Sequence, residues 1–282
     1  MTISIAEWRY KTKNKLNSIS DVVDSDINAI LCNVLGKDLA WCLAHSDENL
    51  NEQDLAQLNQ MVEKLEIRYP LPYILGEIEF YGNHFNVDST VLIPRPETEI
   101  LVELAIEWIS FHPTVQKIVD VGTGSGAIIL SVLNKFPHLY GLGIDISYQA
   151  LKIAKKNRDR FSIRQLDFIQ MDCLNGLENK FDVILANLPY IPENEVHKLD
   201  VAKFEPLLAL NGGEKGIEIF KKFIDQIPDH LSIPGLVLME IQYDQSAFIS
   251  ELISQTIKNY SLSVIKDYAG LDRVIKVEVN YA

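Results

Sequence analysis

Two short segments of the chain carry residue types that can hold and position a reacting ligand, and the first is a glycine-rich turn. It reads Asp120-Val121-Gly122-Thr123-Gly124-Ser125-Gly126-Ala127, after a predicted strand and before a predicted helix. Glycine lets the backbone turn tightly and approach a ligand with no Cβ in the way. Asp145 ends the next predicted strand, where a carboxylate can accept hydrogen bonds from ribose hydroxyls. This pattern predicts a site for an adenosine-like ligand.

The second segment is Asn187-Leu188-Pro189-Tyr190, which follows the predicted strand 181–186. The Asn187 side chain and the Leu188 main chain each offer a carbonyl acceptor, and Pro189 favours an extended conformation of Leu188. Tyr190 offers a flat aromatic face. Two acceptors beside an aromatic plane suit a planar NH2 group, either an amide or an exocyclic amine. Holding both N–H bonds would aim the nitrogen at an electrophile.

Alternating strands and helices after residue 97 are predicted to position both segments. The predicted helices and strands follow each other along the chain at 97–110, 117–121, 127–135, 140–144, 148–158 and 181–186. This alternation predicts an α/β domain with a parallel sheet that helices cover on both faces. Further on, strand-like runs at 236–241 and 273–281 flank a predicted helix at 245–258. We expect the last strand to pair antiparallel at the end of the sheet.

The chain before residue 97 does not show this alternation of strands and helices. Residues 1–75 read as helical, with apolar stripes such as the one from Leu55 to Leu65. Aromatic and β-branched residues around Gly82 predict a short hairpin. We therefore predict three parts: a helical domain of residues 1–75, a hairpin linker of residues 76–96, and an α/β domain of residues 97–282.

Composition excludes several classes of function. The 282 residues carry a formal net charge of −13, which argues against a dedicated nucleic-acid binder, because such binding draws mainly on Lys and Arg. Three scattered cysteines favour a reduced, cytoplasmic setting, and six histidines without a ligand-like cluster indicate no metal. No apolar run is long enough to span a membrane, and the first ten residues show no secretory signal.

The glycine-rich turn alone leaves the ligand open. Gly122, Gly124 and Ala127 also fit the G-x-G-x-x-A fingerprint of dinucleotide-binding proteins. A nicotinamide-dependent oxidoreductase therefore remains possible on the turn alone, but that reading gives the segment 187–190 no role.

Taken together, the segments resemble S-adenosylmethionine-dependent methyltransferases and, more narrowly, the release factor glutamine N5-methyltransferases (PrmC/HemK family). The resemblance runs almost end to end. Its most specific stretch is Leu92-Ile93-Pro94-Arg95-Pro96-Glu97-Thr98-Glu99, and the others are Tyr73-Ile74-Leu75-Gly76, Glu79-Phe80-Tyr81-Gly82, the glycine-rich turn with Asp145, Glu205-Pro206, Gly212-Gly213, Asp267-Tyr268-Ala269-Gly270 and Asp272-Arg273-Val274.

The resemblance implies a fold and a reaction. The fold is a Rossmann-like, seven-stranded α/β methyltransferase domain, with a small N-terminal helical domain joined to it by a β-hairpin. The reaction transfers a methyl group from S-adenosylmethionine to the side-chain amide nitrogen of the glutamine in the Gly-Gly-Gln loop of a class 1 peptide-chain release factor. We expect a monomer with this protein substrate, no direct contact with nucleic acid and no membrane association.

The resemblance also implies residue roles. Asp145 is expected to hold the cofactor's ribose, Asp172 and Cys173 to lie beside its adenine, and Asn187 to contact the cofactor as well as the substrate. Asn187 and the Leu188 carbonyl are expected to grip the substrate amide, with Pro189 and Tyr190 completing the catalytic segment. The residues expected to cradle the cofactor's amino acid end are Gly122, Thr123, Gly124, Ser125 and Gly126.

One residue departs from the family pattern. The family carries Asn-Pro-Pro-Tyr, whereas this chain has Leu188 in place of the first proline, a form familiar from adenine-N6 rRNA dimethyltransferases. Leucine supplies the same main-chain carbonyl but loses rigidity. Two alternatives therefore stay open: an adenine-N6 methyltransferase acting on RNA or DNA, and a non-catalytic module that only binds S-adenosylmethionine.

Overall fold

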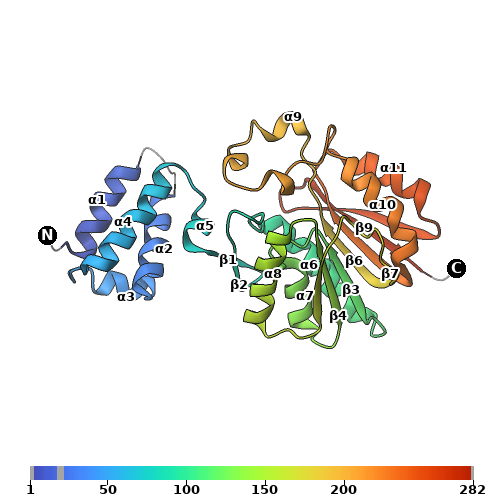
Figure 1. Ribbon diagram of the computed structural model, residues 1–282, viewed down its shortest axis with the longest axis horizontal. Helices are drawn as coiled ribbons and strands as arrows, with labels where there is room; N and C mark the ends of the chain where they lie inside the picture. Colours follow the sequence, from blue (N-terminus) through green and yellow to red (C-terminus); the bar gives the residue numbers. More distant parts are fainter. Residues whose placement is uncertain (1–2, 18–21, 281–282) are drawn as a thin grey trace. The chain divides into compact units, whose positions relative to one another are not determined.

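The structure, a computed structural model, describes residues 3–17 and 22–280. They divide into two compact units, Met1–Gly76 and Glu77–Ala282. The first unit is helical and is drawn in blue to cyan in Figure 1; its helices are α1 (Ile5–Leu16), α2 (Val23–Leu35), α3 (Leu39–Ala44), α4 (Glu52–Glu66) and α5 (Leu71–Leu75).

Local signals in the sequence explain where these helices begin and end. The side chains of Asp38 and Asn51 accept hydrogen bonds from the first turns of α3 and α4, which satisfies donors that a helix start leaves free. Gly36 ends α2 in the left-handed conformation, as glycine commonly does. Buried side chains of α1, α2 and α4, including Trp8, Ile30 and Leu58, form a hydrophobic core that lies wholly within this unit.

The second unit opens with a hairpin of β1 (Glu77–Phe80) and β2 (Asn83–Asn86), paired antiparallel. Its Phe80 and Phe85 are fully buried in the same cluster as Leu101 of the following helix. The predicted hairpin is therefore present, and its aromatic side chains anchor it to the core of the second unit.

A seven-stranded sheet forms the centre of the second unit, with the strand order β5-β4-β3-β6-β7-β9-β8. The strands from β3 to β7 are parallel, and β9 pairs antiparallel with both β7 and β8. Their bounds are β3 (Lys117–Val121), β4 (Tyr140–Asp145), β5 (Leu166–Gln170), β6 (Phe181–Asn187), β7 (Leu231–Glu240), β8 (Tyr260–Lys266) and β9 (Asp272–Val279).

Helices cover both faces of this sheet, as Figure 1 shows. The cores on the two faces are distinct, because successive residues of a strand point to opposite sides: in β6, Val183 and Leu185 pack on one side, and Ile184 and Ala186 on the other. One face carries α6 (Glu99–Phe111), α7 (Ala127–Lys135) and α8 (Tyr148–Phe161), and the other carries α10 (Glu218–His230) and α11 (Ser246–Thr256).

A loop-rich segment between β6 and α10 contains only short elements. They are α9 (Glu193–Val196) and the 3-10 turns 200–203 and 207–209, and a further 3-10 turn at 96–98 precedes α6. Within the described ranges, no helix is long and apolar enough to cross a lipid bilayer.

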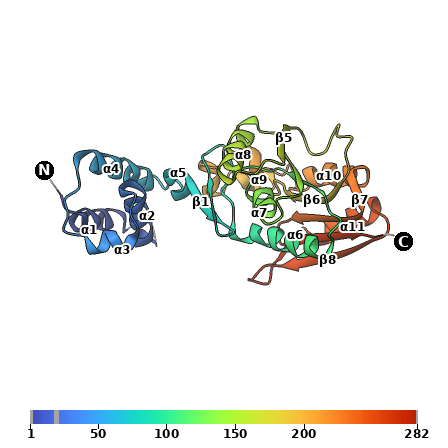
Figure 2. The ribbon, with the colours of Figure 1, turned by 90° about the horizontal axis from the view of Figure 1, so that it is seen from below.

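The α/β fold class and the parallel sheet are confirmed, and one detail of the topology is wrong. The last strand, β9, does pair antiparallel, but it lies inside the sheet, and β8 forms the outer edge (Figure 2). The alternating polar and apolar residues of Tyr260–Lys266 are typical of a strand with one buried face.

Candidate active site

A cavity of about 480 Å³ opens at the carboxyl ends of β3, β4 and β6. Its wall includes Gly122 and Gly124 of the glycine-rich turn, Asp145 at the end of β4, and Asn187 and Leu188 at the end of β6. Open α/β sheets bind ligands at this edge. The two segments that the sequence singles out thus lie together in one cavity.

The glycine-rich turn passes directly beside Asn187. A Cβ atom on Gly122 would stand 3.1 Å from the Asn187 main-chain oxygen and 3.2 Å from a methyl group of Leu188. Gly122, Gly124 and Gly126 all have positive φ angles, of 76°, 55° and 80°, which L-residues with side chains rarely adopt. Backbone conformation therefore favours glycine at all three positions, and the close approach of Asn187 and Leu188 adds a steric reason at Gly122.

Of the other residues of the turn, some line the cavity and others stabilise the turn. Thr123 and Ser125 line the cavity, whereas Gly126 opens α7 and does not. Thr123 donates a hydrogen bond to the buried Asp120 carboxylate (2.7 Å). Burial is the main cause that raises the pKa of Asp120 to about 7, and this hydrogen bond opposes the rise.

The hairpin also supports the turn, through one buried asparagine on α8. Asn157 donates to the Ser125 carbonyl (2.8 Å) and to the Asn86 carbonyl (3.0 Å), and its side-chain oxygen accepts from the Asn86 main chain (2.7 Å). One side chain thus links β2, α8 and the glycine-rich turn.

Asp145 stands at the end of β4 with both carboxylate oxygens facing main-chain donors. Oδ2 accepts from Gly124 N (2.9 Å) and Oδ1 from Ser147 N (2.8 Å). Burial raises the pKa of Asp145, and these two hydrogen bonds act in the opposite direction. Each oxygen keeps a further lone pair, so the carboxylate can still accept hydrogen bonds from vicinal hydroxyls.

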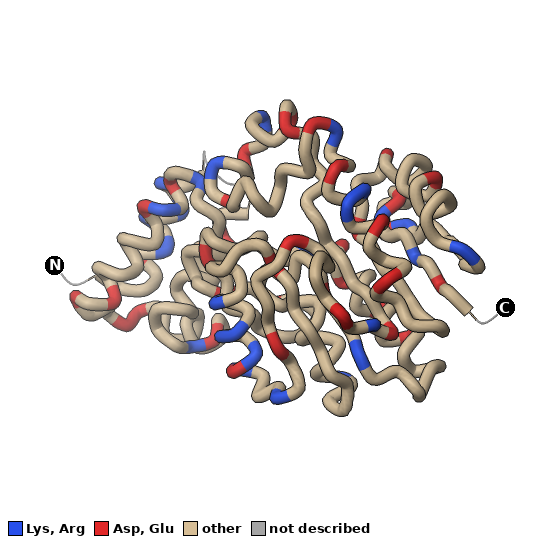
Figure 3. Tube along the Cα trace, turned by 45° about the vertical axis from the view of Figure 1, so that its right-hand side comes forward, with Lys and Arg blue, Asp and Glu red and all other residues tan. Residues whose placement is uncertain are grey.

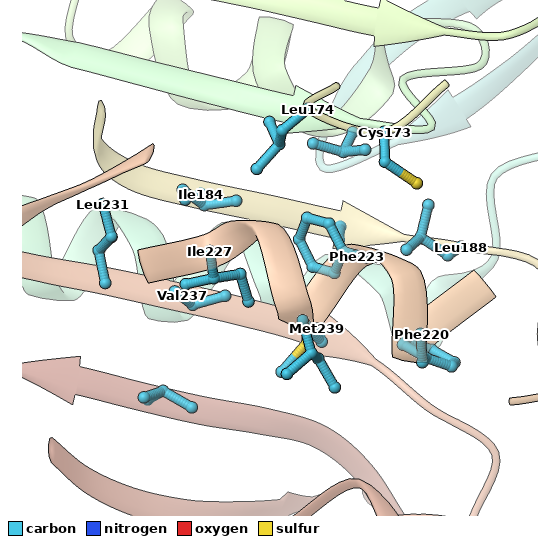
Figure 4. Packing of buried hydrophobic residues seen from close by; sticks show 14 of the residues in the cluster. Cys173, Leu174, Ile184, Leu188, Phe220, Phe223, Ile227, Leu231, Val237 and Met239 are labelled. Atoms are coloured by element: carbon cyan, nitrogen blue, oxygen red, sulfur yellow. The ribbon is translucent and has the colours of Figure 1, made fainter. Parts of the chain in front are cut away.

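Asp172 and Cys173 line the cavity after β5. The Asp172 carboxylate forms an ion pair with Lys222 of α10, which also lines the cavity. Burial raises the pKa of the Cys173 thiol to about 12, so the thiol stays neutral. Figure 4 shows Cys173 and Leu188 at the same end of a buried apolar cluster with Phe220.

The segment 187–190 sends its side chains in different directions. Asn187, Leu188 and Pro189 line the cavity, and Leu188 is 5% exposed because its side chain packs in the apolar cluster. Tyr190 is outside the set of residues that line the cavity. Its hydroxyl lies 3.5 Å from Oε1 of Glu240, and burial raises its pKa to about 12, so the hydroxyl keeps its proton.

Glu240, the last residue of β7, was not foreseen from the sequence as a site residue. It is 2% exposed, and its Oε2 accepts hydrogen bonds from the Thr98 hydroxyl (2.7 Å) and from Asn187 Nδ2 (3.0 Å). Burial raises its pKa to about 7, against the Thr98 hydrogen bond and the charge of Arg273. The signal in the sequence that could have identified it is the position of this single acidic residue directly after the apolar run 236–239.

An ion pair connects the segment before α6 to the loop after β6. Arg95 forms an ion pair with Glu205, which is 4% exposed and also accepts a hydrogen bond from the Ile93 main chain (3.3 Å). Pro94 and Pro206, next to this pair, line the cavity. The pair thus holds two walls of the cavity together, which is a structural role.

The lining of the cavity suits a nucleoside ligand. Its volume lies within the range of about 300–1,000 Å³ typical of small-molecule sites. The glycines supply a backbone-lined wall without side chains, Asp145 supplies acceptors for hydroxyls, and Ile146, Met171 and Ile219 supply apolar surface for a planar ring. Within residues 3–17 and 22–280, no group of three His, Cys, Asp or Glu side chains is placed to hold a metal ion.

Two protein-family descriptions match the chain. The methyltransferase small domain matches residues 98–204, and the PrmC N-terminal domain matches residues 7–76. Among solved structures, a ribosomal protein L11 methylase from Lactobacillus delbrueckii subsp. bulgaricus shares the fold, with a TM-score of 0.52 and 22% identity, over 69% of this chain and 84% of that one.

Curated relatives match nearly the whole chain. Proteins named release factor glutamine methyltransferase are 34% identical in Clostridium acetobutylicum, over 94% of both chains, and 35% identical in Thermodesulfovibrio yellowstonii, over 92% of this chain and 96% of the relative. The relative from Vibrio cholerae is 34% identical over 97% of this chain and 96% of its own. With the glycine-rich turn and residues 187–189 lining one cavity, and with relatives this similar over nearly their full length, the chain belongs to the release factor glutamine methyltransferase family.

Proposed function

We propose that the protein transfers a methyl group from S-adenosylmethionine to the side-chain amide nitrogen (N5) of the glutamine in the Gly-Gly-Gln loop of a class 1 peptide-chain release factor. The observation that carries this proposal is the close approach of Asn187 to Gly122, where an added Cβ atom would stand 3.1 Å from the Asn187 main-chain oxygen. It brings the glycine-rich turn beside the segment that carries the two proposed carbonyl acceptors, and residues of both line the same cavity. Membership of the family supports the choice of substrate.

In this proposal, different residues of the cavity bind the cofactor and the substrate amide. Gly122, Gly124 and Ser125 border the amino acid end of the cofactor, and Asp145 accepts hydrogen bonds from its ribose. The side-chain oxygen of Asn187 and the main-chain oxygen of Leu188 accept the two N–H bonds of the substrate amide. When bound, S-adenosylmethionine supplies the electrophilic methyl group on a sulfonium.

Positioning carries most of the catalysis in this proposal. An amide nitrogen is a poor nucleophile, because its lone pair is delocalised into the carbonyl group. Two acceptors that hold both N–H bonds turn the nitrogen toward the methyl group and favour its change to a tetrahedral geometry. Positioning of this kind is worth up to about 7–11 kcal/mol in favourable systems.

The remaining features support a protein substrate. The net charge is −13, and Figure 3 shows Lys and Arg interspersed with Asp and Glu along the trace. Several basic side chains are paired with acidic ones, such as Lys11 with Glu7 and Lys15 with Glu66. We propose that residues 1–75 recognise the release factor, that 76–96 link them to the catalytic part, and that the protein acts as a cytoplasmic monomer without direct contact with nucleic acid.

The test is to incubate the purified protein with S-adenosylmethionine and a purified class 1 release factor. Mass spectrometry should find one added methyl group on the glutamine of the Gly-Gly-Gln loop. A release factor with that glutamine replaced by glutamate is the matched control and should gain none. Ribosomal RNA forms a separate arm, because Leu188 gives the segment the form found in adenine-N6 methyltransferases. Methylation of RNA and not of the release factor would overturn the proposal.

A further inference from the structure

The orientation of the Asn187 amide decides which group faces the substrate. The oxygen and nitrogen ends of an amide have nearly the same shape, so the hydrogen-bond partners choose between the two orientations. Asn187 Nδ2 donates to Glu240 Oε2 (3.0 Å) and lies 3.3 Å from the Thr98 hydroxyl oxygen. The NH2 end of the Asn187 amide therefore faces Glu240 and Thr98.

Glu240 is placed to enforce this orientation. An ionised carboxylate only accepts hydrogen bonds, so it pairs with the NH2 end of the amide and repels the oxygen end. The Thr98 hydroxyl donates its own hydrogen to the same carboxylate oxygen (2.7 Å), which leaves a lone pair of the hydroxyl facing Asn187. Thr98 and Glu240 thus present only acceptors to Asn187.

We propose that Glu240, with Thr98, is a positioning residue that fixes the Asn187 side-chain oxygen toward the substrate amide. This inference rests on the proposed function for the identity of that substrate. Glu240 itself lies outside the cavity wall, and it acts through Asn187. With the amide reversed, an NH2 group would face the substrate NH2 group, and one of its two acceptors would be lost.

The proposal implies a dependence on the ionisation of Glu240. A protonated carboxyl can donate a hydrogen bond to the Asn187 oxygen, so protonation permits the reversed orientation. The groups facing Glu240 from neighbouring elements are Arg273, whose charge favours ionisation, Glu97, whose charge opposes it, and the hydroxyls of Thr98 and Tyr190. Because burial raises the pKa of Glu240 to about 7, the population of the productive orientation should rise with pH across the neutral range.

Steady-state kinetics of Glu240→Gln, Glu240→Ala and Thr98→Val test the proposal on the full chain. Misplacing a positioned group by about 1 Å can cost about 100-fold, so we expect kcat of Glu240→Ala to fall by about that factor. The Kd for S-adenosylmethionine should stay within about threefold of wild type, because Glu240 does not touch the cavity. Thr98→Ser should recover the activity that Thr98→Val loses.

Glu240→Gln gives the sharper readout. Its carboxamide has the same shape but does not titrate, so we expect the fall in kcat below neutral pH to be absent in this variant. Glu278→Gln is the matched control, because Glu278 lies on β9 opposite Leu236, at the other end of the β7 pairing from Glu240. A Glu240→Gln variant with the wild-type kcat and the wild-type pH profile would overturn the proposal.

Nuclear magnetic resonance of the 15N-labelled protein provides a readout without turnover. The Asn187 side-chain NH2 signals, identified by their loss in Asn187→Asp, should shift with pH in the wild type and stay constant in Glu240→Gln. Signals that do not respond to pH in the wild type would contradict the positioning role even if the enzyme is active. A wild type that responds to pH but leaves the release factor unmethylated would instead contradict the proposed function.

Discussion

Asn187 is the side chain on which the chemistry depends most directly. In the proposed mechanism it supplies one of the two acceptors for the substrate amide, while the glycine-rich turn and Asp145, which also line the cavity, border the cofactor. We expect Asn187→Ala to reduce kcat by about 100-fold or more, since the nucleophile is no longer held in place. The Kd for S-adenosylmethionine, measured by calorimetry, should stay close to the wild-type value.

The matched control is Asn179→Ala, which removes the same amide group from an exposed position before β6. It should leave both kcat and the Kd unchanged. Undiminished turnover in Asn187→Ala would rule out the grip on the amide.

Leu188 separates the chemical role of a residue from its structural role. Its main-chain carbonyl faces the reaction in the proposed mechanism, whereas its side chain is 5% exposed and packs among the residues of Figure 4. Removing a buried leucine side chain typically costs about 2–5 kcal/mol of unfolding free energy. We expect Leu188→Ala to lower the unfolding free energy in urea by about this amount while it retains methyl transfer at a temperature where it is folded.

That result would show that leucine at this position stabilises the fold and that the carbonyl suffices for the reaction. A complete loss of activity in the folded variant would show instead that the side chain shapes the site.

At the scale of elements, the segment 187–190 packs against a second loop that carries Gly212, Gly213 and Gly216. Gly216 has a φ of 74°, and a Cβ atom there would collide with the Tyr190 carbonyl oxygen. That carbonyl also accepts a hydrogen bond from the Gln245 side chain (3.0 Å), as does the Gly216 carbonyl (3.0 Å). We expect Gly216→Ala to displace the segment, with a large loss of kcat and a lower melting temperature.

Gly270 provides the matched control for backbone strain. Its φ of 81° is similar, but a Cβ atom there would meet nothing within 4 Å. Gly270→Ala therefore carries the strain of a left-handed alanine without the collision. Equal losses of activity in the two variants would show that the contact with Tyr190 is unimportant.

Local sequence patterns predicted the elements that carry the glycine-rich turn. They did not predict features that depend on which strands pair in the sheet. The strand 117–121 and the helix 127–135 were predicted with the bounds they have in the structure, because a buried parallel strand followed by glycines and an apolar helix is a strong local signal. The edge strand β8 was missed, and so was the amphipathic helix α10. Glu240 was missed as a site residue because its role depends on β7 pairing beside β6, which no local pattern contains.

At the scale of the whole molecule, two buried carboxyl groups make stability depend on pH. Burial raises the pKa of Asp120 and of Glu240 to about 7 each, above the values they have in the unfolded chain. The folded state therefore binds more protons than the unfolded state between about pH 4 and pH 7, and stability falls as pH rises through this range. Ionisation of each group in the folded state lowers the free energy of unfolding by on the order of 3 kcal/mol.

Asp120→Asn tests this directly, because asparagine keeps an acceptor for the Thr123 hydroxyl but does not ionise. We expect the difference in unfolding free energy, variant minus wild type, to be more positive at pH 8.5 than at pH 5.5 in urea titrations. A difference that does not change with pH would show that Asp120 does not titrate between these values.

The division of the chain into two units gives the last prediction. Each unit has a hydrophobic core of its own, and all residues that line the cavity belong to residues 77–282. A protein lacking residues 1–76 should therefore bind S-adenosylmethionine with the Kd of the full chain. If the N-terminal unit recognises the release factor, kcat/KM for the intact release factor should fall by about tenfold or more, the equivalent of about 1.4 kcal/mol of lost binding. A short peptide containing the Gly-Gly-Gln sequence should be methylated equally by both forms, since it reaches only the cavity. An unchanged kcat/KM for the intact release factor would assign substrate recognition to the catalytic unit alone.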